Sequence, residues 1–139
     1  MAKFKFRLDK LLEYRRLQEK WAKDTYLATV ARRVETEGEI EGIARRKTLA
    51  ATSRPCALDG LVSLDCYLTR LDDEQRGQEA ALAVIEGEVE TALKAWNEAR
   101  QAAEAIGKLR ESELVAWNVE QNRKEQGELD EWSVFRRAA

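Results

Sequence analysis

Apolar residues recur at alternating intervals of three and four positions from Leu61 to Ile106, over seven heptads. With Leu61 at position a, the a positions hold Leu61, Leu68, Gln75, Leu82, Val89, Trp96 and Ala103. The d positions hold Leu64, Leu71, Gln78, Ile85, Ala92, Ala99 and Ile106. A repeat of this length is typical of a coiled-coil seam, in which Gln75 and Gln78 form one polar layer that fixes the register. We therefore predict a long helix that packs against a partner helix.

The partner is predicted to be the N-terminal arm of the same chain, as a helix over about residues 4–51. Its apolar positions are fainter than those of the second arm, and charged residues interrupt them. The predicted seam positions are Leu8, Leu12, Ala22, Tyr26, Ile40 and Ile43, with interruptions at Arg15, Glu19 and Arg33. Glycine within a helix costs roughly 1 kcal/mol, so Gly38 and Gly42 weaken this arm further.

One turn is predicted, at about residues 52–60. Pro55 disfavours helical geometry at Arg54 and ends the first helix. Asp59 has the side chain of a helix N-cap and starts a second helix over about 61–136. The predicted fold is therefore all-α: a single coiled-coil domain, residues 1–139, that forms a long two-helix antiparallel hairpin.

Folding the chain about residue 56 places residue i opposite roughly residue 112 − i, as the geometry of a helical hairpin requires. Phe6 then faces Ile106, where the heptad seam also ends. Residues 108–139 are expected to project as an unpaired helix that overhangs the hairpin. Its apolar residues then lack a partner within the chain: Leu109, Leu114, Trp117, Leu129, Trp132 and Phe135. Exposed aromatic residues on a lone helix favour docking into another protein.

Charge divides the chain into two parts. The net charge of −2 is the sum of +6 over residues 1–58, with 14 basic against 8 acidic side chains, and −8 over residues 59–139, with 10 against 18. A basic arm and an acidic arm attract each other when the chain folds back. Acidic residues interrupt the basic clusters, so neither nucleic-acid binding nor membrane insertion is expected. No signal peptide and no apolar run long enough to span a membrane are predicted, which indicates a cytosolic protein.

No catalytic, cofactor or metal site is predicted. The chain has no histidine, and its carboxylates fall on solvated helix faces. Gly107-Lys108 lacks the first glycine and the Ser or Thr of a phosphate-binding loop, because Ala102 and Leu109 stand there. Cys56 and Cys66 are expected to be reduced thiols without a structural bond. We therefore expect a protein that is not an enzyme.

Several segments resemble the flagellar export protein FliJ. The first is Phe4-Lys5-Phe6-Arg7-Leu8, followed by Leu11-Leu12 and Tyr14-Arg15-Arg16. The second arm adds Leu64, Tyr67, Leu68 and Leu71, and then Ala92-Leu93-Lys94-Ala95-Trp96 with Leu109. The last segment is Leu129-Asp130-Glu131-Trp132 followed by Phe135-Arg136-Arg137. Their order and spacing extend the resemblance over nearly the whole chain.

The resemblance implies a non-enzymatic stalk of the flagellar type III export apparatus. Such a protein is cytoplasmic, associates peripherally with the inner face of the cell membrane, and docks in the hexameric export ATPase ring. It links the ring to the cytoplasmic domain of the export gate and handles export chaperones. The implied ring-binding residues are Arg15, Arg16, Leu129, Asp130, Trp132, Phe135 and Arg136.

The implied gate-binding residues are Tyr67, Leu71, Glu74 and Gln78. Glu74 departs from the small apolar residue of the family. Leu71 and Gln78 are also seam positions, so a structural role for them stays open. Two alternative functions also stay open: the equivalent stalk of a virulence-type secretion system, and a coiled-coil scaffold unrelated to secretion.

Overall fold

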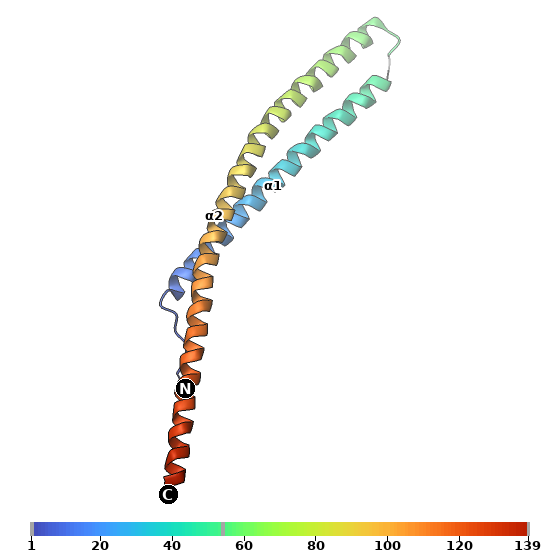
Figure 1. The fold of residues 1–139 in the computed structure, drawn as a ribbon. Coiled ribbons are helices and arrows are strands. Elements are labelled where there is room, and N and C mark those ends of the chain that lie inside the picture. The colour runs from blue at the N-terminus through green and yellow to red at the C-terminus, as the bar shows by residue number, and fades with distance from the viewer. Residues whose placement is uncertain (1, 54, 139) are drawn as a thin grey trace. The chain divides into compact units, whose positions relative to one another are not determined.

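The computed structural model describes residues 2–53 and 55–138, which form two helices, α1 (Asp9–Thr52) and α2 (Leu58–Ala138), and no strand. Contacts within the helices and between them divide the chain into two units. We call Trp21–Trp96 the hairpin unit, and Met1–Lys20 with Asn97–Ala139 the terminal unit. In the hairpin unit the two helices run antiparallel, joined by the turn between them (Figure 1). The prediction of an all-α helical hairpin is confirmed.

Helix α1 begins at Asp9 instead of the predicted Phe4, so residues 2–8 are not helical. The backbone N–H of Asp9 donates to the carbonyl of Phe6 at 3.2 Å, in a turn that leads into the helix. The carboxylate of Asp9 lies in the first helical turn, where the helix dipole favours negative charge. We call residues 2–8 the N-terminal strap.

Helix α2 begins at Leu58, and the carbonyl of Ala57 accepts the backbone N–H of Leu61 at 3.1 Å. Asp59 therefore lies inside the first turn, and its prediction as the N-cap is wrong. Its carboxylate still stabilises the positive end of the helix dipole. Pro55 was expected to end the first helix by disfavouring helical geometry at Arg54. Arg54 lies outside the described residues.

Gly60 is in close contact with the turn. A Cβ atom added at Gly60 would lie 2.6 Å from Cβ of Pro55, which is too close for two carbon atoms. The missing side chain therefore allows the proline ring to pack against the first turn of α2.

We expect Gly60→Ala to lower the free energy of unfolding by about 1 kcal/mol or more, because the clash with Pro55 outweighs the gain in helix propensity. Thermal unfolding followed by circular dichroism measures this change. Gly38→Ala is the control, since nothing lies within 4 Å of a Cβ there and the substitution should stabilise the helix. A Gly60→Ala variant that is as stable as Gly38→Ala would contradict the contact.

The predicted seam of α2 is confirmed, since every one of its fourteen positions except Leu61 is at least partly buried. The six predicted apolar positions of the N-terminal arm, five on α1 and Leu8 in the strap, are also buried or half-buried. The predicted interruptions at Arg15, Glu19 and Arg33 lie within this seam and are half-buried, so they continue it.

The seam of α1 also contains three polar residues that were not predicted: Thr29 and Thr36, both buried, and Lys47, half-buried. The Thr29 hydroxyl donates to the carbonyl of Thr25 at 2.7 Å, and the Thr36 hydroxyl donates to the carbonyl of Arg32 at 3.0 Å. Because each hydroxyl finds a partner on its own helix, it can be buried without an unsatisfied hydrogen bond.

The register of the hairpin unit differs from the prediction. Arg32 pairs with Glu88 at 2.9 Å, Arg46 pairs with Glu74 at 4.0 Å, and the Tyr26 and Trp96 rings lie 5.5 Å apart. In each pair the residue numbers add up to about 120 instead of 112, a shift of roughly two helical turns on α2.

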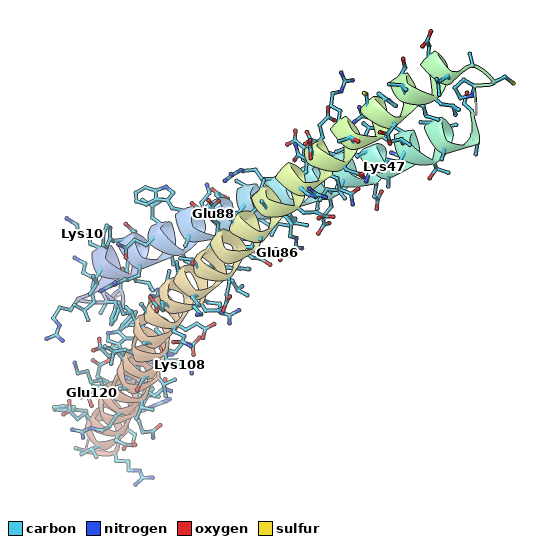
Figure 2. All side chains as sticks on the ribbon, turned by 90° about the horizontal axis from the view of Figure 1, so that it is seen from above. Lys10, Lys47, Glu86, Glu88, Lys108 and Glu120 are labelled. Carbon is cyan, nitrogen blue, oxygen red and sulfur yellow. The ribbon has the colours of Figure 1, made fainter. Side chains whose placement is uncertain are left out.

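The reason for this shift is an asymmetric turn. Helix α2 begins beyond the last turn of α1 (Figure 1), so Leu58 and Leu61 have no partner helix and remain exposed. Lys47 marks the last paired turns of α1 (Figure 2), where its ammonium group contacts Asp72 and Gln75 of α2.

In the terminal unit, the N-terminal strap packs on α2. Phe6 is 5% exposed, and the Phe4 ring lies 5.9 Å from the ring of Trp117. The Arg110 guanidinium lies 5.7 Å from the centre of the Phe4 ring and 3.4 Å from the Asp9 carboxylate. The prediction that pairing ends at Ile106 is therefore wrong, because the strap extends it to Trp117.

Because the N-terminal strap packs on α2, fewer residues of α2 lack a partner than predicted. Leu114 and Trp117, predicted to lack partners, are half-buried. Every described residue after Gln121 is exposed, and we call residues 122–138 the tail.

Candidate docking surfaces

The tail has one apolar face. Leu129, Trp132 and Phe135 are spaced three residues apart, so they lie within about 120° of one another around the helix. They are 61%, 60% and 76% exposed. The positions that continue the heptad seam hold mainly polar residues instead: Glu120, Lys124, Gly127, Glu131 and Val134. The apolar face of the tail is therefore not an extension of the seam, and it suits a different partner.

Arg136 belongs to the same face. Its guanidinium lies 5.1 Å from the centre of the Trp132 ring, within the range of a cation–π interaction. Asp130 lies on the other side of the helix by its position in the turn, and its carboxylate accepts a hydrogen bond from the Gln126 amide at 3.3 Å. The structure thus brings together four of the five predicted ring-binding residues of the tail and leaves Asp130 apart.

The two predicted ring-binding arginines of α1 lie in different environments. Arg15 is a half-buried seam residue whose Nη1 donates to Oε1 of Gln18 at 3.3 Å. Arg16 is exposed and lines a shallow hollow of about 330 Å³ in the terminal unit. The other residues around this hollow are Glu19, Ala103, Glu104, Gly107, Lys108 and Glu111. Arg16 is therefore the more accessible of the two arginines.

The four predicted gate-binding residues do not form one surface. Leu71 is fully buried in the seam, and Gln78 is a half-buried seam residue. Glu74 is exposed at the edge of the hairpin, and its carboxylate pairs with Arg46 at 4.0 Å and with Arg70 at 3.9 Å. Tyr67 is half-buried and lies beside the seam, one residue before the seam position Leu68.

Tyr67 has neighbours that the sequence analysis did not identify. With Val62, Ser63, Cys66 and Arg70 it lines a shallow hollow of about 430 Å³. The Arg70 guanidinium lies 5.6 Å from the centre of the Tyr67 ring. The i, i+4, i+8 spacing of Val62, Cys66 and Arg70 could have indicated this face, but heptad analysis ignores positions outside the seam.

The described residues hold no group of three or more His, Cys, Asp or Glu side chains arranged to bind a metal ion. Across residues 2–53 and 55–138, neither helix is both long and apolar enough to cross a membrane. Both cysteines are exposed and free.

Comparison with known protein families identifies a match over nearly the whole chain. The family model described as "Flagellar FliJ protein" matches residues 4–138. Neither the search of curated proteins nor the search of solved structures finds a match.

Proposed function

The chain belongs to the family of flagellar FliJ proteins, and from this premise we propose that it is the stalk that joins the export ATPase to the export gate. The family is a non-catalytic component of flagellar protein export. In this proposed role the chain is not an enzyme, and it acts by binding other proteins of the export apparatus. The flagellar description of the family favours this role over a virulence-type stalk or an unrelated scaffold.

The observation that carries the proposal is the exposed apolar face of the tail. A monomeric protein rarely leaves two large aromatic side chains and a leucine together in water unless another molecule covers them. Covering one such side chain contributes about 2 kcal/mol to binding through the hydrophobic effect. We propose that the ATPase ring receives this face, with Leu129, Trp132 and Phe135 as anchors.

Charged residues complete the proposed ring contact. Arg136, already held over Trp132, would present its guanidinium to carboxylates of the ring. Arg16 offers a second exposed guanidinium on α1, while Arg15 supports that segment from the seam. Asp130 would contact the ring from the other side of the tail, as a pore that surrounds the helix allows.

The hairpin unit would supply the gate contact. Tyr67 and Glu74 are the accessible members of the predicted group, and Arg70 lies against both side chains. Leu71 and Gln78 would act by holding this part of α2 in place. Binding to the gate would keep the protein at the inner face of the membrane, where it would also handle export chaperones.

The proposal is tested with the purified protein, its cognate flagellar export ATPase and the cytoplasmic domain of the gate. We expect the protein to co-purify with the ATPase and to stimulate ATP hydrolysis. A protein that neither binds nor stimulates this ATPase would rule out the stalk function.

The variant Tyr67→Ala distinguishes the proposed contact with the gate from the proposed contact with the ATPase ring. We expect it to weaken gate binding about tenfold or more, as loss of an aromatic anchor does, while ATPase stimulation stays unchanged. Ser63→Ala is the matched control, because Ser63 lines the same hollow but adds no aromatic surface. Equal gate binding by both variants, measured by calorimetry, would remove Tyr67 from the contact.

A further inference from the structure

Two stretches of the hairpin unit face each other at mid-length: residues 34–43 of α1 and residues 77–88 of α2. Cross-helix ion pairs lie at both ends of this region. Arg32 pairs with Glu88 at one end, and Arg46 pairs with Glu74 at the other. Among these described residues, no side chain of residues 34–43 forms a hydrogen bond or ion pair with a side chain of residues 77–88. We call the two stretches together the mid-hairpin segment.

Four glycines lie in the mid-hairpin segment: Gly38 and Gly42 on α1, and Gly77 and Gly87 on α2. Glycine is the least favourable residue of a helix interior apart from proline. None of the four is required by packing. A Cβ would meet nothing within 4 Å at Gly38, Gly77 or Gly87, and only the mobile end of Arg45 at 4.0 Å at Gly42. The glycines therefore weaken both helices without allowing any closer contact within the hairpin.

The same segment concentrates negative charge. It has no Lys or Arg, and its seven carboxylates are Glu35, Glu37, Glu39, Glu41, Glu79, Glu86 and Glu88. Figure 2 marks Glu86 and Glu88 on α2. Cations from outside the segment pair with only two of the seven, as Arg33 with Glu37 and Arg32 with Glu88. Like charges four residues apart, as in Glu35 and Glu39, destabilise a helix, and like charges on two facing helices oppose their pairing.

The adjoining part of the hairpin unit has neither feature. Residues 22–30 and 89–96 contain no glycine, and their charges balance, with Lys23 and Lys94 against Asp24 and Glu90. Across their seam the Tyr26 and Trp96 rings lie 5.5 Å apart in a tilted arrangement. A section rich in glycine and negative charge thus lies next to one that has neither feature on the same two helices.

We propose that the mid-hairpin segment is a built-in point of local opening, where α1 and α2 separate together while the adjoining section stays paired. Opening exposes the seam residues Ile43 and Ile85, which are 3% and 7% exposed in the closed hairpin. Native proteins open in such cooperative units, with free energies well below that of global unfolding. This local opening lets the hairpin bend at the mid-hairpin segment while the pairing register of the adjoining section is kept.

Amide hydrogen exchange of the full-length protein tests the proposal. Amides of residues 34–43 and 77–88 should exchange at least about tenfold faster than those of residues 22–30 and 89–96, which lie equally inside the two helices. Uniform exchange along the hairpin unit would overturn the proposal.

The double variant Gly38→Ala with Gly42→Ala tests whether the two helices open together. Each alanine should lower the opening equilibrium about fivefold, so exchange should slow roughly twenty-five-fold in total. If opening is shared, the slowing reaches residues 77–88, where nothing was changed. Slowing confined to α1 would overturn the shared opening. Gly127→Ala in the tail is the control and should leave exchange of the mid-hairpin segment unchanged.

Discussion

Deletion of residues 122–139 is expected to abolish stimulation of the export ATPase while leaving the stability of the paired helices unchanged. The deletion begins after the last half-buried residue, Gln121, so no residue of the seam is lost. It removes the whole apolar face of the tail, whose side chains are more than half exposed and make no seam contact. ATP hydrolysis measures the first effect, and thermal unfolding followed by circular dichroism measures the second.

A cut directly after Lys108 would be a poorer test. It would also remove Arg110 and Trp117, which hold the N-terminal strap against α2. Any loss of stimulation could then arise from disruption of the terminal unit.

A finer test of the same prediction is the double variant Trp132→Ala with Phe135→Ala. Burial of these two aromatic anchors in the ring would contribute about 4 kcal/mol together, so the ATPase concentration for half-maximal stimulation should rise roughly 700-fold. Val134→Ala is the matched control, because Val134 is equally exposed in the tail but lies on its opposite face. Equal losses in the control and the double variant would show that the apolar face is not the site of contact.

Leu71→Ala is expected to lower the free energy of unfolding by about 3 kcal/mol, the largest effect of a single substitution in the hairpin unit. Leu71 is 0% exposed, so its loss leaves a cavity between α1 and α2. Urea unfolding measures the change through a shift of the midpoint.

Leu58→Ala is the control for this substitution, because Leu58 is 75% exposed and its replacement should change stability by less than about 0.5 kcal/mol. Gate binding of the Leu71→Ala variant is measured at a temperature where it remains folded. Normal stability combined with lost gate binding would contradict the seam position of Leu71 and favour direct contact with the gate.

The heptad repeat predicted the seam of α2 because burial between helices requires apolar side chains at a and d, and the repeat is long enough to define one register. The seam of α1 was harder to predict. Thr29 and Thr36 are polar in sequence, yet their hydroxyls bond to their own helix and so can be buried. Arg33 and Lys47 reach the seam because their aliphatic stems can be buried while their charges stay near water.

The pairing register and the N-terminal strap could not be predicted, because both depend on contacts between distant parts of the chain. A symmetric turn was assumed, whereas α2 starts beyond the end of α1. Phe4 and Phe6 were placed on a helix because apolar spacing alone does not separate a helical start from an extended segment packed on a neighbour. For the tail, the exposed Trp132 and Phe135 were visible in the sequence. Their separation from the seam by about a third of a helical turn follows once the register is extended.

Site-specific photo-crosslinking from position 132 tests the central claim most directly. A photoreactive phenylalanine analogue in place of Trp132 should crosslink to the export ATPase when the two purified proteins are mixed. The same analogue in place of Val84, which is as exposed but lies in the hairpin unit, should give no ATPase crosslink. A crosslink to the ATPase from position 84 and none from position 132 would contradict docking of the tail in the ATPase ring.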